Sequence, residues 1–174
     1  MAVVEPLDRV DPARFREVMG RFATGVTILV ADVAGDVRGM TANAFMSGSL
    51  DPPLCIVSIA KRAHMHWHLI AAGTFSVSIL AAGQEDLAMH FAGRPVPGLR
   101  VAFDAFVGVP AITGTTATIA AEIASRHECG DHTVFISHIM AMAAHDRPPL
   151  LYHASRFAAL VPLREEAPSL PEFW

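Results

Sequence analysis

The sequence predicts a mainly β domain, an antiparallel barrel or sandwich with short peripheral helices. Strand patterns recur at close spacing along the 174 residues, and the helical patterns between them are short. The regular strand–helix alternation and the glycine fingerprint of a doubly wound parallel sheet are both missing from the sequence. A chain of this length is typical of a single domain. We expect its core at about residues 11–161 and an irregular C-terminal tail at 162–174.

The first predicted element is a helix that begins at Asp11 and Pro12. Aspartate is a favoured N-cap residue, and proline is favoured at the first helical position. Gly25 can end this helix. Apolar residues follow at helical spacing, namely Phe15, Val18, Met19 and Phe22.

Strands are predicted next. Residues 26–33 are apolar and β-branched, which is typical of a buried strand. Residues 34–36, Ala-Gly-Asp, predict a hairpin turn, so the chain returns from residue 37 as a second strand. Residues 54–59, LCIVSI, predict another strand.

The middle of the chain alternates between short helices and a strand. Residues 61–72 change to a helical period, and Gly73 can close the helix. Residues 74–80 alternate polar and apolar side chains, which predicts a half-buried strand. Residues 84–91 predict a short helix with two acids in its first turn, where the helix dipole favours them.

The last part of the chain is predicted to be loop and then strand. Prolines and glycines interrupt residues 94–114, so we expect mostly loop there, with a short strand around residues 101–103. The four strands expected after this loop, the first two joined through residues 128–131, are residues 115–125, 133–141, 150–153 and 156–160.

The stretch Gly39–Pro53, GMTANAFMSGSLDPP, is the first candidate binding segment. Its small residues let a flat ligand lie against the backbone, and its hydroxyls donate or accept hydrogen bonds. Asp51-Pro52-Pro53 then restricts the direction of the chain. The alternative is a strand, a bend and a strand without a ligand.

Composition bounds the class of protein. Hydrophobic residues make up 52% of the chain and charged residues 17%, so we expect a second subunit to cover part of the apolar surface. The net charge of −4 provides no basic surface for nucleic acid. No apolar run approaches the roughly 18–20 residues of a membrane span, and the N-terminus does not resemble a signal peptide. A cytoplasmic protein is therefore expected, with Cys55 and Cys129 as buried thiols rather than a disulfide framework.

Two further segments are candidates for binding or catalysis. In the first, Ser58 ends a strand and is followed by Lys61 and Arg62 just before a helix, an arrangement that suits a phosphate group. In the second, Gly130-Asp131-His132 opens a strand, from which the imidazole can project into a cleft. The alternative for both segments is an exposed polar turn.

The histidine-rich segment is a weaker candidate. His64 and His68 lie four residues apart on a predicted helix, a spacing that can share a metal ion. The acid that a zinc-protease motif requires after His64 is missing, and no cysteine or carboxylate cluster is close in sequence. We therefore expect no metal site.

Several motifs occur in a specific order between about Phe15 and Leu160. They lie at residues 15–27, 39–53, 58–62, 73–77, 84–93, 130–132 and 151–157. Together they resemble the flavin reductase family, which supplies reduced flavin to two-component monooxygenases. No single motif is decisive, but their order and spacing together are specific.

The resemblance implies a split β-barrel homodimer that binds FMN, or FAD, near the subunit interface. It implies hydride transfer from NADH or NADPH to the flavin, and a partner monooxygenase that uses the reduced flavin. His132 would lie near the nicotinamide, as the candidate catalytic residue. The implied flavin site consists of Thr41, Ala42, Asn43, Ala44 and Ser47 along the ring and ribityl chain, Asp51 and Pro52 shaping the pocket, Ser58, Lys61 and Arg62 at the phosphate, and Phe91 and Arg94 closing the site. A non-catalytic flavin carrier or sensor on the same fold is the alternative, because fold alone does not determine function.

Overall fold

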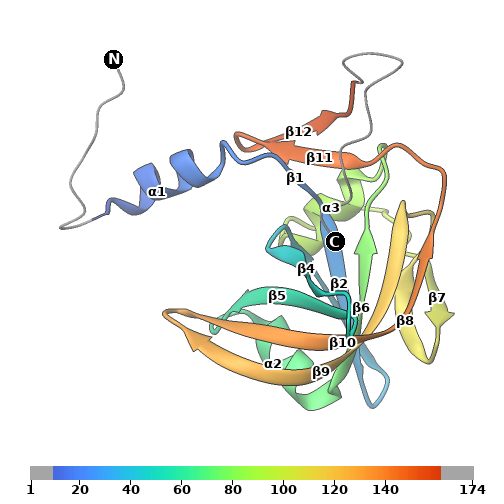
Figure 1. Ribbon diagram of the computed structural model, residues 1–174. Helices are drawn as coiled ribbons and strands as arrows, with labels where there is room; N and C mark the ends of the chain where they lie inside the picture. The colour runs from blue at the N-terminus through green and yellow to red at the C-terminus, as the bar shows by residue number, and fades with distance from the viewer. Residues whose placement is uncertain (1–9, 162–174) are drawn as a thin grey trace.

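Antiparallel sheets and three short helices make up the part of the chain that the computed structural model describes, residues 10–161 (Figure 1). The helices are α1 (Pro12–Met19), α2 (His64–Ala72) and α3 (Glu85–Phe91). The strands are β1 (Thr24–Gly25), β2 (Thr27–Val33), β3 (Asp36–Ala42), β4 (Phe45–Ser49), β5 (Leu54–Ala60), β6 (Thr74–Ile79), β7 (Phe103–Phe106), β8 (Val109–Ile112), β9 (Ala117–Cys129), β10 (His132–Ala144), β11 (Leu150–His153) and β12 (Arg156–Ala159). The predicted C-terminal tail, residues 162–174, lies outside the described residues.

The largest sheet has the strand order β3-β2-β6-β9-β10-β5-β4, and every neighbouring pair is antiparallel. Its two edge strands, β3 and β4, follow each other in the chain and are separated only by Asn43 and Ala44. The sheet must therefore curve round until its two edges meet at these residues. This is a split antiparallel β-barrel with few helices, which confirms the fold class.

The barrel interior follows the period of two expected for strands. In β5 the side chains of Cys55, Val57 and Ile59 are buried, and those between them are half-exposed. Large side chains from the facing strands fill the same core, including Leu29, Phe75, Val77 and Phe135.

Two helices pack against the barrel. Met65 and Leu69 of α2 are buried in the main core cluster. Ala88 of α3 is buried in a second cluster that includes Ile28 and Leu150. The contacts of Ala88 hold α3 against β2 and β3. This helix therefore lies next to the break between β3 and β4, which consists of Asn43 and Ala44.

Helix α1 begins as the sequence predicts, because the Asp11 side chain accepts a hydrogen bond from the backbone N–H of Ala13. The prediction that the helix continues toward Gly25 is wrong, since it ends at Met19 with Gly20 as its cap. The helix projects from the barrel (Figure 1), and the four apolar side chains are exposed, namely Phe15, Val18, Met19 and Phe22.

The hairpin of β7 and β8 was not predicted, because the prolines and glycines of residues 94–114 indicate loop. Only a short strand around residues 101–103 was expected, and β7 begins at Phe103. A two-residue turn, in which Val107 and Gly108 have φ of 50° and 82°, connects the strands. Strand β8 is held by the wall of the barrel: Ile112 N–H donates to Ser78 Oγ, and Ser76 Oγ donates to the Pro110 carbonyl. These hydrogen bonds to β6 stabilise a strand that the local sequence does not favour.

The hairpin of β9 and β10 is longer than predicted, and its tip projects beyond the barrel (Figure 1). Each strand has 13 residues, and the turn consists of Gly130 and Asp131. Exposed polar residues occupy most of the tip of β9, which is why the sequence pattern appeared to end at Ser125.

Candidate functional site

A pocket of about 500 Å³ lies where the end of β3, helix α3 and the β11–β12 hairpin meet. Its walls combine small and apolar side chains with the rings of Tyr152 and Phe157, whose centroids are 5.7 Å apart in an edge-to-face arrangement. A mostly apolar pocket of this volume with few polar groups is typical of a small-molecule site. The lining residues are Val26, Thr41, Ala42, Asn43, Ala88, Met89, Ala92, Arg94, Tyr152, Ser155 and Phe157.

Side-chain hydrogen bonds hold the β3 wall of this pocket in place. Thr41 Oγ1 donates to the Ala88 carbonyl of α3 at 2.7 Å, and Thr27 Oγ1 donates to the Ala42 carbonyl at 2.7 Å. The Thr41 hydroxyl, expected to face a ligand, therefore uses its proton to join β3 to α3. Its oxygen keeps lone pairs that can accept a hydrogen bond.

The break between β3 and β4 contributes Asn43 and Ala44. Asn43 lines the pocket and brings an amide that can both donate and accept. The Ala44 carbonyl accepts a hydrogen bond from Ser58 N–H at 3.1 Å, which joins the break to β5. Three of the small predicted residues, Thr41 to Asn43, thus line one pocket, with Ala44 next to them.

Phe91 and Arg94 flank the pocket from α3 and the residues after it. A Cβ at Gly39 would lie 2.5 Å from Cε1 of Phe91, so glycine is required for the ring to lie on β3. Phe91 supports the wall from behind and does not line it, whereas Arg94 lines the pocket directly. Arg94 thereby brings a positive charge to an otherwise apolar site.

Ser47, Asp51 and Pro52 lie elsewhere, on the exposed β4–β5 hairpin. Ser47 is paired with Cys55, and a cis peptide bond joins Asp51 to Pro52 in the turn. The structure does not bring these three predicted residues into the lining of the 500 Å³ pocket.

A second polar group gathers where β5 ends and β10 begins. Ala60 is paired with His132, and Lys61 N–H donates to the Asp131 carbonyl at 3.0 Å. Helix α2 starts three residues later than predicted, so Lys61 and Arg62 lie in the turn before it. Ser58, Lys61, Arg62 and His132 are therefore neighbours, although the sequence analysis treated His132 as a candidate separate from the other three. None of the four lines the pocket.

Two carboxylates form the ion pairs of this group, Asp131, which belongs to a candidate segment of the sequence analysis, and Glu128, to which that analysis gave no role. The Lys61 ammonium pairs with Glu128, and this hydrogen bond lowers the pKa of Glu128. His132 Nδ1 lies 2.7 Å from Asp131 Oδ1, and this hydrogen bond lowers the pKa of Asp131. The His132 side chain is 42% exposed, so its other ring nitrogen remains accessible to a ligand.

Sequence reasoning assigned no role to the β11–β12 part of the pocket. Tyr152, Ser155 and Phe157 come from the last strand pair, more than a hundred residues after Asn43. Two of them, Tyr152 and Phe157, lie in motifs that carry the family resemblance, and that was the only available signal.

The histidines of α2 have separate partners. His66 is buried and its Nε2 lies 2.9 Å from Thr133 Oγ1, whereas His68 Nε2 lies 3.4 Å from Asp36 Oδ2. Within residues 10–161, no group of three or more His, Cys, Asp or Glu side chains is arranged to hold a metal ion.

The two cysteines differ in environment. Cys55 is buried as expected, and burial raises the pKa of its thiol to about 11. The prediction that Cys129 is buried is wrong, because it lies exposed at the end of β9. No helix in the described part of the chain is long and apolar enough to cross a membrane.

Comparison with known proteins places this geometry in context. The family described as "Flavin reductase like domain" matches residues 19–160. An NADH-dependent flavin reductase of Rhodococcus sp is 40% identical over 162 residues, covering 91% of this chain and 92% of the relative. The reductase component of 4-hydroxyphenylacetate 3-monooxygenase of Thermus thermophilus is 36% identical, covering 84% of this chain and 95% of the relative.

A solved structure has the same fold. The NADH:FAD oxidoreductase SgcE6 of Streptomyces globisporus C-1027, in complex with NAD and FAD fragments, superposes with a TM-score of 0.83 at 38% identity. The match covers 93% of this chain and 98% of that one.

Proposed function

This chain belongs to the flavin reductase like domain family, and from that premise we propose that it oxidises NADH and reduces FMN or FAD for a partner monooxygenase. The observation that carries the proposal is the 500 Å³ pocket between β3, α3 and the β11–β12 hairpin. The related flavin reductases and the monooxygenase reductase component support both the reaction and the kind of partner.

The pocket residues fit a flavin. Ala42, Ala88 and Ala92 leave room for a flat ring system, and Tyr152 and Phe157 provide aromatic contact. Asn43 and Arg94 supply the few polar contacts that orient a ligand in such a pocket. The flavin, when bound, supplies the hydride-accepting chemistry, and the protein contributes binding, orientation and electrostatics.

We assign the second polar group to the charged parts of the substrates. Lys61 and Arg62 would bind a flavin phosphate by charge-assisted hydrogen bonds, with Ser58 beside them. His132 would hold the nicotinamide by a hydrogen bond, because hydride transfer requires the donor carbon at near-attack distance. In this proposal Asp131 fixes the orientation of the imidazole through the 2.7 Å hydrogen bond.

A homodimer is also part of the proposal. Met46, Ile56 and Ile136 lie side by side on the outward face of β4, β5 and β10, on the opposite side of the sheet from the buried core residues. Met46 is 59% exposed. A second copy of the chain would cover this row, and two chains would then build each flavin site.

We expect the protein in the cytoplasm. Both cysteines are free, which fits a reducing compartment.

The decisive experiment mixes the purified protein with NADH or NADPH and with FMN or FAD, and follows the loss of reduced-nicotinamide absorbance. Turnover that requires both a nicotinamide and a flavin supports the reductase. Bound flavin without turnover for any of the four pairs would instead favour a flavin carrier or sensor.

A further inference from the structure

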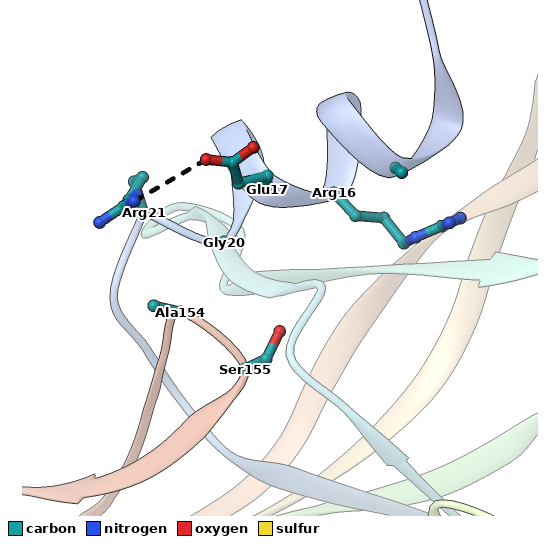
Figure 2. Close-up of a pocket in the computed structure, with 7 residues that line it drawn as sticks. Arg16, Glu17, Gly20, Arg21, Ala154 and Ser155 are labelled. Atoms are coloured by element: carbon teal, nitrogen blue, oxygen red, sulfur yellow. Dashed lines mark ion pairs between the residues drawn. The ribbon is translucent and has the colours of Figure 1, made fainter.

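Two walls of the 500 Å³ pocket are held in different ways. On one side, β11 pairs with both β1 and β12, and Ala154 N–H donates to the Gly20 carbonyl at 2.8 Å. Figure 2 shows this turn at the end of α1, next to a second hollow of about 420 Å³. On the other side the wall consists of α3 and the segment that follows it, from which Arg94 lines the pocket. Backbone hydrogen bonds thus fix the first wall, whereas the second depends on how the segment after α3 is held.

The segment after α3 has few backbone donors. Pro95 and Pro97 have no N–H, so Val96 supplies the only one within residues 95–97. This N–H donates to Nδ1 of His90, in the last turn of α3, with 3.3 Å between the two nitrogens. A side chain of α3 therefore provides the acceptor for this part of the segment.

Arg94 is held from both sides. Its own N–H donates to the Met89 carbonyl at 3.1 Å, and the Val96 N–H two residues later donates to His90. Pro95, between them, biases the backbone of Arg94 toward extended conformations. Loss of the His90 acceptor would release the chain beyond Pro95, and with it the direction of the Arg94 side chain.

The direction of this hydrogen bond determines which form of His90 can make it. A backbone N–H only donates, so Nδ1 must accept, and the proton of the neutral ring is on Nε2. A protonated imidazole has an N–H on both ring nitrogens and cannot accept. Histidine is the side chain that changes charge between about pH 5 and 8. Protonation therefore removes the acceptor of the Val96 N–H.

No nearby charge replaces this hydrogen bond when the ring is protonated. Asp36 and Arg38 of β3, the strand beneath α3, pair with each other. Within residues 10–161, His90 forms no ion pair. The other charged groups on the elements around it are Glu85 and Asp86 of α3, Arg94 and Arg100 of the segment, Asp32 of β2 and Asp104 of β7.

We propose that His90 is a positioning residue for the flavin pocket. Its neutral imidazole holds the segment after α3 and, through it, keeps Arg94 at the pocket, and protonation of the ring releases both. The inference rests on the proposed function, which assigns the pocket to flavin. It adds a pH-dependent control of flavin affinity that acts from outside the pocket, because His90 does not line it.

The first test compares His90→Asn with His90→Ala. Asparagine Oδ1 is bonded to Cγ, as Nδ1 of histidine is, so it can accept the Val96 N–H at any pH. Both variants lose the edge-to-face contact of the His90 ring with Phe91, so their difference reports on the acceptor. At about pH 8, FMN fluorescence titration is expected to show near wild-type affinity for His90→Asn and roughly two- to tenfold weaker binding for His90→Ala, the range for one hydrogen bond. Equally weak binding by both variants would overturn the proposal.

A pH profile separates this role from a purely structural one. Between about pH 8 and about pH 5.5, the wild type is expected to lose FMN affinity relative to His90→Asn by roughly two- to tenfold. The other histidines, His132 included, are present in both proteins, so the ratio of the two affinities reports on His90. This comparison does not require His90→Ala to fold. A ratio that stays constant with pH would overturn the proposal.

A double-variant cycle tests whether Arg94 carries the effect. In an Arg94→Ala background, His90→Ala is expected to cause no further loss of FMN affinity, because residues that act through one another are not additive. A loss as large as that in the wild-type background would overturn the link between His90 and Arg94.

Amide exchange separates this inference from the proposed function. NMR of the protein without flavin is expected to show roughly two- to tenfold faster exchange of the Val96 amide in His90→Ala, and an unchanged rate in His90→Asn. That result would support the control of the segment by His90 even if the wild type bound no FMN, which would refute the proposed function alone. Equal exchange rates in all three proteins would overturn the inference.

Discussion

Lys61 is the only lysine of the chain, and its ammonium pairs with the carboxylate of Glu128. The side chains are 40% and 77% exposed. An exposed pair of this kind contributes little to stability, because water screens both charges. A phosphate dianion is a stronger partner for an ammonium group than one carboxylate. The ion pair with Glu128 therefore does not prevent Lys61 from binding a phosphate.

Replacement of Lys61 by alanine is expected to weaken FMN more than riboflavin. A charge-assisted phosphate contact contributes on the order of 1.5–3 kcal/mol, or roughly tenfold to a hundredfold in affinity, and riboflavin has no phosphate. Fluorescence titration of both ligands measures the difference. Glu128→Gln is the matched control, since it removes the competing carboxylate and should leave FMN affinity unchanged or higher. Equal losses for both ligands would show that Lys61 does not contact the phosphate.

His132→Ala is expected to raise KM for NADH or to lower kcat while flavin affinity stays nearly unchanged. The imidazole is half-exposed at the start of β10 and is oriented by Asp131. Loss of a positioning group affects the hydride-transfer step more than flavin binding. Steady-state kinetics and a flavin titration on the same variant provide the two readouts. A flavin-binding defect of equal size would place His132 in the flavin pocket, and unchanged kinetics would leave it an exposed turn histidine.

At the scale of elements, the packing of α3 on β3 determines the shape of the proposed flavin pocket. Phe91 lies directly over Gly39, and Thr41 donates to the Ala88 carbonyl of the same helix. Ala88, Met89 and Ala92, which α3 and its end supply, line the pocket. A substitution at Gly39, which lies under α3, is therefore expected to alter the lining of the pocket without contacting a bound ligand.

Gly39→Ala is expected to destabilise the fold by about 1–3 kcal/mol and to weaken flavin binding, because the new Cβ would displace the Phe91 ring. Urea unfolding and a flavin titration measure the two effects. Gly25→Ala is the control, since no atom lies within 4 Å of a Cβ at that position. The double variant Gly39→Ala with Phe91→Leu should recover part of the stability. A Gly39→Ala protein as stable as Gly25→Ala would refute the close approach.

At the scale of the whole molecule, apolar side chains remain uncovered in two places. One is the row of Met46, Ile56 and Ile136 on the outward face of the barrel. The other is α1 and the residues just after it, where Phe15 and Phe22 are 55% and 73% exposed. A surface of this kind is typical of a protein that buries part of its apolar area in an interface.

If the proposed homodimer forms, Met46→Glu is expected to shift it toward monomer and to lower flavin affinity. A carboxylate in the centre of an apolar interface loses its hydration without gaining a partner. Sedimentation velocity at micromolar concentration measures the assembly, and Val37→Glu on β3, at the opposite edge of the sheet, is the control. A wild-type protein that is a stable, active monomer would remove this prediction and the shared flavin site with it.

The sequence by itself was enough to determine the elements whose signals are local. The alternation in β5, the turn at Ala34 and Gly35 and the cap at Asp11 each depend on residues within a few positions of one another. Alternation also predicted the strand at residues 74–80, but the prediction that it is half-buried is wrong, because its polar residues Ser76 and Ser78 are buried as well. Family motifs spread along the chain added the split barrel and part of the candidate site. Among the pocket residues, Thr41, Ala42, Asn43 and Arg94 were named in advance.

Only the tertiary structure decided the features that depend on contacts between distant segments. The hairpin of β7 and β8 forms despite Pro110, because Ser76 and Ser78 of β6 form hydrogen bonds with β8. The exposure of α1 follows from its position outside the barrel, which a helical period cannot indicate. Lys61 forms an ion pair with Glu128, and Tyr152 and Asn43 line one pocket. Both arrangements arise because the closed barrel brings together residues far apart in the chain. Local periodicity specifies which face of an element is apolar, whereas the partner of that face is determined by the closed sheet.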